Sequence, residues 1–358
     1  QQWPGYRTML PLLAAIAAGL AVCSSALRMR GPEDEVAQVE REYDDLVWSA
    51  EAESAPASVP RPPPSPKQLQ QEPCESCSYR GVNFTARDEA GIRDCKRQVP
   101  VRAAGGSAGS LGSSPPDEPF YLFIMCPPFS GSSAMLSMIA TSPRVATLCP
   151  FNHWQCEGMR ELIARNMVDK AARWNPGKIN WSEALDVYEE GWQKDIRRKG
   201  PQAFIRAEKS PPMIHHVDDL AVQFAGRKSQ VAFLFVTRSP CYRSSSISVN
   251  VWDKYSRMLV HGLELAQRSG FRHMVMQYEK LVTSPCAAAE DVLRFLPDLE
   301  TLNPGRSGYS TENAARNTPV LDYALAKARK KEPLTRPEST CIDANTRETS
   351  RQLGYEDE

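Results

Sequence analysis

The feature that most constrains the fold is an alternation of short apolar segments with longer helix-like segments, which begins at residue 120. Most of the short segments are rich enough in apolar, β-branched or aromatic residues to be strands buried on both faces. The strand candidates are residues 120–126, 144–149, 203–206, 231–236 and 272–278. The helix candidates are residues 132–141, 157–173, 182–199, 213–225, 242–268 and 285–296. Strands that alternate with helices favour a parallel sheet with right-handed crossovers, so the sequence predicts an α/β fold with helices on both faces.

Composition divides the chain into four parts. Residues 1–30 read as a membrane anchor or signal segment, and residues 31–73 as an acidic and then proline-rich stalk. Residues 74–119 hold cysteines and a Gly/Ser linker, and residues 120–358 form the expected catalytic domain. The stalk has few large apolar residues, so it cannot bury enough surface to offset its ordering entropy, and we expect it to be extended.

An apolar segment near the beginning of the sequence predicts entry into the secretory pathway. Residues 8–27 are mostly apolar and are flanked by Arg7, Arg28 and Arg30. This length suits a membrane-spanning helix, while the small residues 24–26 also resemble a signal-peptide cleavage site. A buried core helix is a third reading. We expect a Golgi membrane protein with a luminal catalytic domain, with secretion as the alternative.

Cysteine content and charge narrow the classes of partner. Cys74 and Cys77 have the spacing of zinc ligands, but no second Cys or His pair follows, so we expect no metal. In an oxidising lumen disulfides are the expected use, with Cys95 as a candidate partner of this pair. Nine cysteines lie outside the apolar segment, and an odd number leaves at least one free thiol. Lys+Arg and Asp+Glu both number 43, so no overall charge favours nucleic acid as a partner.

A small-residue stretch follows the first strand candidate and has the composition of an anion-binding loop. It contains Phe129, Ser130, Gly131, Ser132 and Ser133, and a helix-like segment follows. Parallel sheets bind ligands at the carboxyl ends of their strands, where helix N-termini direct backbone N–H groups at anions. Gly131 would let the backbone approach a ligand closely, so we expect added bulk there to block binding with little effect on stability. No lysine follows the glycine, which disfavours a nucleotide kinase or NTPase.

A second polar cluster follows the strand candidate 231–236. Arg238 comes at the end of this strand, Pro240 lies two residues on, and Ser246 lies eight residues after the arginine. In a parallel sheet this arginine would point into the same cleft as the small-residue loop. Taken alone, the cluster would favour the plainer reading of a surface arginine and a serine-rich helix start.

Together these stretches resemble the sulfotransferase family that uses 3'-phosphoadenosine 5'-phosphosulfate, over about residues 118–300. In that family a loop like residues 128–133 holds the 5'-phosphosulfate, and an Arg, Pro and Ser spaced like Arg238, Pro240 and Ser246 hold the 3'-phosphate. The resemblance implies a P-loop-like sulfotransferase fold, this nucleotide as co-substrate, and no metal.

Two further stretches extend the resemblance. "EKSPPM", residues 208–213, is similar to an element of Golgi-type carbohydrate sulfotransferases that carries a lysine at the acceptor site, here Lys209. "QYEKLV", residues 277–282, is similar to a strand end that often follows in the family. Glu157 opens a helix candidate as the catalytic glutamate does in several members, and His153 is the second candidate for the base. His215 and His216 are expected on a helix surface.

One residue departs from the family pattern. Phe129 stands where the family has a Lys or Arg that steadies charge on the oxygen between phosphate and sulfate, a contribution worth several kcal/mol. Lys209 is the best candidate to replace that cation. The expected reaction is sulfuryl transfer to a hydroxyl, most readily of a carbohydrate. The alternatives are transfer to tyrosine in proteins and an inactive nucleotide-binding homologue. The sequence fixes neither the acceptor nor the oligomeric state.

Overall fold

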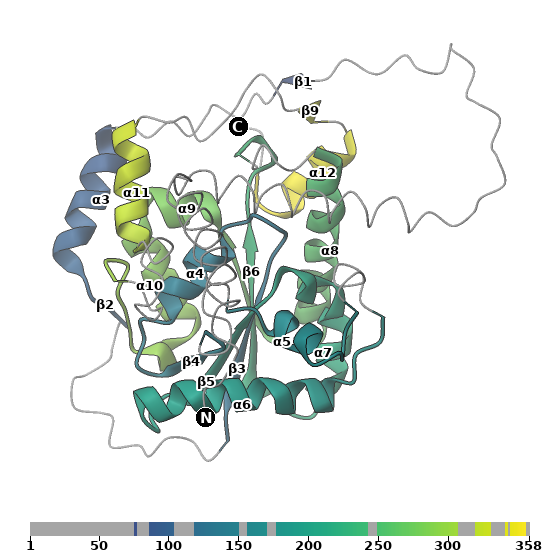
Figure 1. Ribbon diagram of the computed structural model, residues 1–358. Coiled ribbons are helices and arrows are strands. Elements are labelled where there is room, and N and C mark those ends of the chain that lie inside the picture. The colour runs from purple at the N-terminus through teal and green to yellow at the C-terminus, as the bar shows by residue number, and fades with distance from the viewer. Residues whose placement is uncertain are drawn as a thin grey trace, which may run out of the picture. The chain divides into compact units, whose positions relative to one another are not determined.

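A computed structural model describes residues 75–76, 86–103, 118–149, 156–169, 177–242, 249–306, 319–330, 341–342 and 344–355 (Figure 1). All of them belong to one compact unit, Pro60–Glu358. The expected membrane segment, the stalk, His153 and Ser246 lie outside the described residues. In the ranges given above, no helix is both long and apolar enough to cross a membrane.

The centre of the unit is a five-stranded sheet in which all neighbouring strands are parallel. Its order is β4 (Val145–Thr147), β5 (Ile205–Lys209), β3 (Phe120–Met125), β6 (Val231–Thr237) and β7 (Arg272–Gln277). Every residue of the first four of these strands is buried, as expected for strands covered on both faces. The predicted parallel sheet is confirmed. β5 begins and ends later than the strand predicted over residues 203–206, so Glu208 and Lys209 belong to the strand itself.

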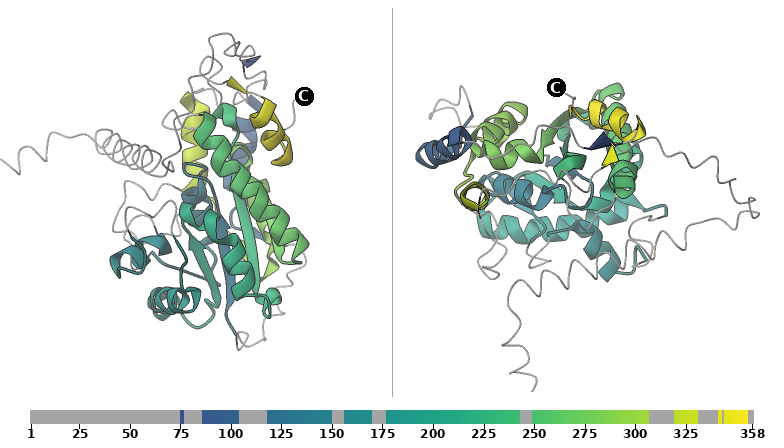
Figure 2. Two further views of the ribbon diagram at one scale, coloured as in Figure 1. Left: turned by 90° about the vertical axis from the view of Figure 1, so that its right-hand side faces the viewer. Right: turned by 90° about the horizontal axis from the view of Figure 1, so that it is seen from above.

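Helices cover both faces of this sheet, as predicted. One face packs against α6 (Trp181–Lys199), α7 (Val217–Gln223) and α8 (Val249–Arg268). The other packs against α4 (Ser132–Ile139), α9 (Tyr278–Thr283) and α10 (Pro285–Phe295), and α11 (Val320–Lys330) and α3 (Ala86–Gln98) form an outer layer there. Figures 1 and 2 show these two groups on opposite sides of the strands. The fold class is therefore α/β with helices on both faces.

The remaining elements are short. α5 (Gly158–Ala164) packs against α6, and α12 (Ala344–Gln352) packs against α8. Two antiparallel pairs join β1 (Glu75–Ser76) to β9 (Cys341–Ile342) and β2 (Val101–Arg102) to β8 (Thr301–Leu302). The 3₁₀ turns are η1 (Pro211–His216), η2 (Lys228–Gln230), η3 (Pro240–Tyr242) and η4 (Pro297–Leu299).

Several helix bounds differ from the sequence prediction. The helix expected over 157–173 ends at Ala164. The one expected over 213–225 is split into η1 and α7. After β7 the chain turns at once into α9, so Tyr278 is helical where the prediction extended the strand.

The disulfides tie distant elements together. Cys95 of α3 is bonded to Cys286 of α10, which corrects the expectation that Cys95 pairs with Cys74 or Cys77. Cys149 is bonded to Cys156 just before α5, and Cys241 is also in a disulfide. Cys126, at the end of β3, is a buried free thiol, as the odd number of cysteines predicted.

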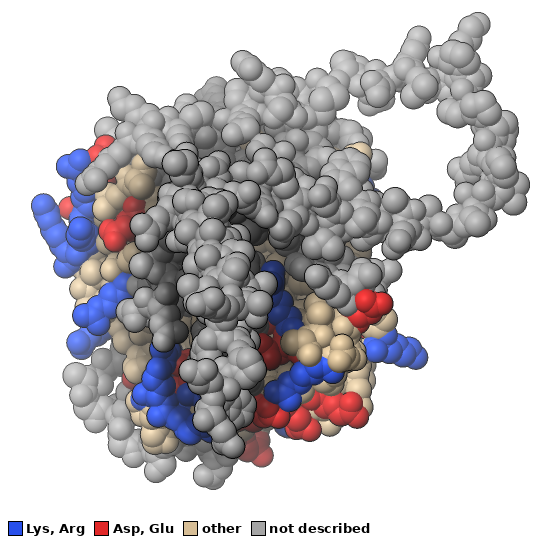
Figure 3. Space-filling view, in the orientation of Figure 1, with Lys and Arg blue, Asp and Glu red and all other residues tan. Residues whose placement is uncertain are grey.

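On the face drawn in Figure 3, the described residues include charged side chains of both signs. Basic residues gather along the edge formed by α3, where Arg93, Lys96 and Arg97 are exposed. Two of these are held by acidic neighbours on the same helix, Arg93 by Glu89 and Arg97 by Asp94. These exposed pairs contribute little to stability.

Candidate functional site

The small-residue loop lies at the carboxyl end of β3, the middle strand of the sheet. Phe129 and Gly131 both have positive φ angles, 59° and 86°, so the backbone turns sharply there. The N–H of Ser130 donates to Pro127 O at 3.3 Å, and Gly131 O accepts the first hydrogen bonds of α4. The turn thus places the N-terminus of α4 at the carboxyl edge of the sheet, where backbone N–H groups favour an anion.

The loop serines differ in their surroundings. Ser130 and Ser132 are buried, with exposed fractions of 2% and 5%, while Ser133 is exposed. The Ser132 hydroxyl hydrogen-bonds the Cys126 thiol, whereas the buried Ser130 hydroxyl has no hydrogen-bond partner among the described residues. Burial raises the pKa of this thiol to about 11, against the smaller lowering effects of Lys209 and Ser132. Cys126 is therefore a neutral, buried group next to the loop.

Arg238 and Tyr278 form the other wall of the loop. Arg238 follows β6, and its Nη1 donates to Phe129 O at 2.8 Å. Its guanidinium carbon lies 4.7 Å from the centroid of the Tyr278 ring, a cation–π distance. A Cβ placed on Gly131 would lie 2.1 Å from the same ring. Bulk at Gly131 therefore disturbs the protein itself, which corrects the expectation that stability would be unaffected.

A buried carboxylate supports the Arg238 segment from behind. Glu279 Oε1 accepts a hydrogen bond from the Ser239 N–H at 2.8 Å, and its Oε2 accepts one from the Tyr355 hydroxyl at 3.0 Å. Burial raises the pKa of Glu279, and these hydrogen bonds oppose the shift. The sequence pattern at residues 277–282 marked this stretch but did not reveal that Tyr278 and Glu279 position Arg238.

The two residues predicted to carry the chemistry are in direct contact. Lys209 Nζ lies 2.9 Å from Glu157 Oε1, and Arg160 Nε lies 3.2 Å from Glu157 Oε2. Lys209 and Glu157 are only 2% and 7% exposed. Lys209 pairs with Ile124 across the sheet, so the ion pair lies at the same strand ends as the small-residue loop that follows β3. The structure thus brings together two residues that lie 52 positions apart in the chain.

Glu208 and Ser210, on either side of Lys209, form a second buried network. Glu208 Oε1 accepts hydrogen bonds from the Gly158 N–H at 3.0 Å and from the Ser210 hydroxyl. Ser210 Oγ in turn accepts the Met159 N–H at 3.1 Å. Burial raises the pKa of Glu208 to about 7. Sequence reasoning used this stretch only for its lysine and missed the two residues beside it.

The prediction that His215 and His216 lie on a helix surface is wrong for His216, which is buried, whereas His215 is half-buried. His216 is 2% exposed, and its Nδ1 lies 2.9 Å from Asp219 Oδ2. His215 packs edge-on against Tyr255 of α8, and burial lowers its pKa to about 4. Both histidines are covered because η1 packs under α8.

The carboxyl edge of the sheet therefore presents three kinds of group. The α4 N-terminus offers backbone N–H groups and serine hydroxyls, Arg238 offers a guanidinium, and Glu157 with Lys209 offers a paired acid and base. Such a set can bind an anion and accept a proton next to it. In the described ranges, no group of three or more His, Cys, Asp or Glu residues could hold a metal ion.

Comparisons with known proteins add a loose structural similarity. No protein-family model matches the chain, and no curated protein matches it. The chain is similar to a solved structure described as the sulfotransferase domain from the Synechococcus PCC 7002 olefin synthase. The identity is 16%, 68% of this chain and 98% of that domain are covered, and the TM-score is 0.37. A similarity at this level shows neither the family nor the activity of this chain.

Proposed function

We propose that the protein is a sulfotransferase that moves a sulfuryl group from 3'-phosphoadenosine 5'-phosphosulfate to a hydroxyl, most readily of a carbohydrate. The observation that carries the proposal is the Lys209–Glu157 ion pair, which lies at the sheet edge where the small-residue loop and Arg238 also lie. Sulfuryl transfer needs in-line positioning, neutralised charge and a base on the acceptor hydroxyl, and this edge holds groups for each.

Each group has a role in this proposal. The N-terminus of α4, with Ser130, Ser132 and Ser133, binds the 5'-phosphosulfate, and Arg238 binds the 3'-phosphate together with Ser246. Glu157 accepts the proton of the acceptor hydroxyl while the hydroxyl oxygen forms its bond to sulfur. The bond from sulfur to the bridging oxygen breaks in the same transfer, and adenosine 3',5'-bisphosphate leaves. Lys209 faces the charge that develops on that bridging oxygen.

Phe129 makes the source of the loop cation the critical point of the proposal. The Phe129 side chain carries no charge, but its backbone oxygen accepts a hydrogen bond from Arg238. A guanidinium therefore lies beside the loop. Lys209 is the second cation near the loop. With Arg238 assigned to the 3'-phosphate, Lys209 is the group that would supply the positive charge that a loop Lys or Arg would otherwise contribute.

Location and acceptor are part of the same proposal. The apolar segment 8–27 would carry the chain into the Golgi, where the domain would act on luminal glycans. The disulfides of the described domain are typical of an oxidising compartment. Protease protection of the full-length protein in sealed vesicles tests the location. A domain that is digested without detergent would contradict it.

The function is tested by sulfate transfer from labelled donor to a panel of glycans and tyrosine peptides. We expect transfer to at least one glycan. Transfer to tyrosine peptides alone would replace the carbohydrate proposal with tyrosine sulfation. Nucleotide binding without transfer to any acceptor would indicate an inactive homologue, and absence of nucleotide binding would contradict the whole proposal.

A further inference from the structure

The buried network around Glu208 is not used by the proposed reaction, yet it touches the segment that carries the base. Glu208 is fully buried on β5, directly before Lys209, and its Oε1 accepts the N–H of Gly158. Gly158 is the first residue of α5 and follows Glu157 in the chain. One peptide unit therefore separates the Glu208 carboxylate from the residue proposed as the base.

Ser210 completes the contact on the other side of Lys209. Its hydroxyl donates to Glu208 Oε1 and accepts the N–H of Met159, so the first two N–H groups of α5 both bond to side chains of the β5 end. Those N–H groups have no partner within the helix. Glu208 and Ser210 thus fix α5 to the strand that carries Lys209.

We propose that Glu208 and Ser210 are positioning residues that hold the start of α5, and through it the Glu157 carboxylate, against Lys209. The catalytic consequence rests on the proposed function, whereas the positioning itself does not. Lys209 and Glu157 are buried, so their side chains have little freedom to adjust. The contact between Lys209 Nζ and Glu157 Oε1 therefore depends on where the start of α5 lies relative to the end of β5. Loss of the contact would leave the fold in place and move the base.

The ionisation of Glu208 makes the contact dependent on pH. Burial raises the pKa of Glu208 to about 7, and the hydrogen bonds from Ser210 and Gly158 and the charge of Lys209 oppose the shift. Glu157 from the start of α5 raises it, and Tyr188 of α6 is the other titratable group beside it. Oε2 has no hydrogen-bond partner among the described residues. Charged Glu208 binds the α5 N–H groups more strongly than the neutral acid, because charge-assisted hydrogen bonds are the stronger ones.

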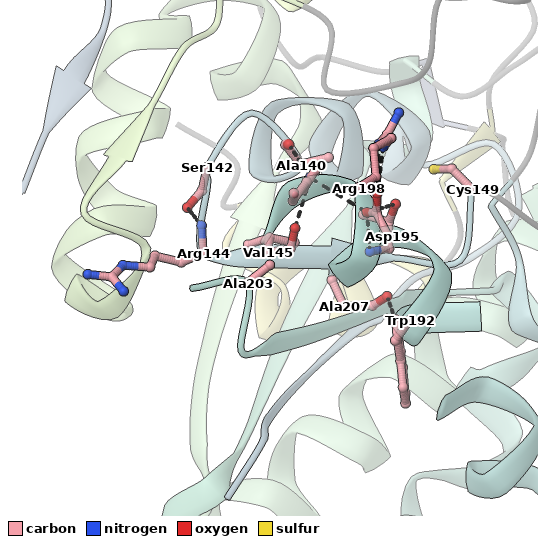
Figure 4. Close-up of polar contacts among 12 residues, drawn as sticks. Ala140, Ser142, Arg144, Val145, Cys149, Trp192, Asp195, Arg198, Ala203 and Ala207 are labelled. Atoms are coloured by element: carbon pink, nitrogen blue, oxygen red, sulfur yellow. Dashed lines mark hydrogen bonds and ion pairs between the residues drawn. The ribbon is translucent and has the colours of Figure 1, made fainter. Parts of the chain in front are cut away.

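Asp195 offers a matched control in the same domain. It is a fully buried carboxylate on α6 that accepts the N–H of Thr147 at 2.9 Å and pairs with Arg198. Figure 4 shows Asp195 with Arg198 and the neighbouring β4 and β5 residues. Asp195 therefore accepts a backbone N–H of β4, as Glu208 accepts one of α5. Unlike Glu208, Asp195 has no contact with the Glu157–Lys209 pair among the described residues.

Hydrogen exchange of the free protein tests the positioning without any assay of activity. In Glu208→Gln and Ser210→Ala, the amides of residues 158–160 should exchange at least about 10-fold faster, and in Asp195→Asn they should not. In the wild type, protection of these amides, corrected for the intrinsic rate, should fall below about pH 7, and Glu208→Gln should lack this step. Unchanged exchange in folded Glu208→Gln and Ser210→Ala would overturn the proposal.

Kinetics test the consequence for the base. Glu208→Gln and Ser210→Ala should lower kcat about 10-fold or more and leave the affinity for adenosine 3',5'-bisphosphate unchanged. Ser210→Thr, which keeps the hydroxyl, should retain most of the activity. An equal loss of kcat in Asp195→Asn at equal stability would show a merely structural role and overturn the catalytic part. If the wild type binds nucleotide but transfers no sulfate, the proposed function fails, and the exchange experiment alone decides on the positioning.

Discussion

At the residue scale, the central finding is that Lys209 and Glu157 hold each other in a buried ion pair. Breaking a buried pair leaves an uncompensated charge and costs about 3–5 kcal/mol. The pair therefore combines a structural role with the proposed chemical one. Variants at these positions must be compared with the wild type at matched stability before their activity is interpreted.

Lys209→Met and Glu157→Gln should each reduce turnover about 10²-fold or more, because each removes a preorganised charge or the base from the site. Affinity for adenosine 3',5'-bisphosphate should change little, since neither residue is proposed to hold the nucleotide. Turnover is measured at saturating donor, with folding checked by circular dichroism. Full activity in both folded variants would show that the chemistry is assigned to the wrong residues.

Phe129→Lys is the complementary change in the loop. If no cation serves the bridging oxygen, the new lysine should raise turnover; if Lys209 already serves it, a second positive charge nearby should lower turnover. We expect the decrease, because the charge of Lys209 already acts on Cys126 at the base of the loop. Steady-state kcat of the two proteins decides between these outcomes, and an increase would contradict the assignment of Lys209.

His215 predicts a loss of stability in mild acid. Burial lowers its pKa to about 4 in the folded protein, while the unfolded chain binds the proton below about pH 6.5. The unfolded state thus binds more protons as pH falls from 6.5 to 4, and stability decreases by up to about 3 kcal/mol. Chemical denaturation at pH 7.5 and pH 4.5 should show a smaller difference for His215→Phe than for the wild type. An equal difference would contradict the account.

Glu208 has the opposite effect on stability. Its pKa is raised from 4.5 to about 7, so the folded state keeps the proton that the unfolded chain releases, and stability decreases as pH rises through this range. Burial also lowers the pKa of His216 and raises that of Glu279, so the wild-type profile combines several contributions. Only the difference between His215→Phe and the wild type isolates the histidine.

At the element scale, the site depends on how the ends of neighbouring strands pack. The β3–α4 loop rests on the first residue of α9 through the contact between Gly131 and Tyr278, and Tyr278 also stacks on Arg238. A change in the loop is therefore transmitted to the arginine. The sequence could not show this, because the two segments lie almost 150 residues apart and only the sheet order brings them together.

Gly131→Ala should lower both stability and nucleotide affinity. The new Cβ would lie 2.1 Å from the Tyr278 ring, at a φ of 86° that alanine disfavours. Gly91→Ala is the matched control, because Gly91 lies exposed within α3 and nothing lies within 4 Å of an added Cβ. The control should gain about 0.5–1 kcal/mol. Thermal unfolding and calorimetry check both variants, and an unchanged Gly131→Ala protein would contradict the packing described.

The strand and helix pattern was largely predictable from the sequence. Buried parallel strands are apolar over their whole length, so β3 and β6 stood out at once. β5 was placed too early because its last residues are Glu208 and Lys209, which are charged and therefore do not look like a buried strand. The error in the predicted bounds of β5 falls at the candidate site. Functional sites are where sequence-based expectations most often fail.

At the scale of the whole molecule, long-range constraints were the least predictable part. The Cys95–Cys286 disulfide joins residues 191 positions apart, and no local pattern indicates such a pairing. The burial of His215 and His216 likewise depends on α8, which begins more than 30 residues later. Sequence patterns identify which residue types gather at a sheet edge, but their partners depend on tertiary packing.

This disulfide should contribute strongly to stability. It closes a long loop in the unfolded chain, which corresponds to about 5 kcal/mol in the chain-entropy account. A Cys95→Ala/Cys286→Ala double variant should unfold at a clearly lower temperature than the wild type under non-reducing conditions. Because neither α3 nor α10 contributes a residue to the proposed nucleotide site, the nucleotide affinity should stay the same well below that temperature. Unchanged unfolding would show that the bond is not formed in the protein.

The most direct test of the central claim is calorimetry with adenosine 3',5'-bisphosphate on the wild type and on Arg238→Ala. The wild type should bind the nucleotide at one site. Arg238→Ala should weaken binding by about 1.5–3 kcal/mol, the contribution of a charge-assisted contact to phosphate. Exposed Arg97 on α3 provides a control substitution that should leave binding unchanged. Equal affinity in a folded Arg238→Ala protein, or no binding by the wild type, would contradict a nucleotide site at this edge of the sheet.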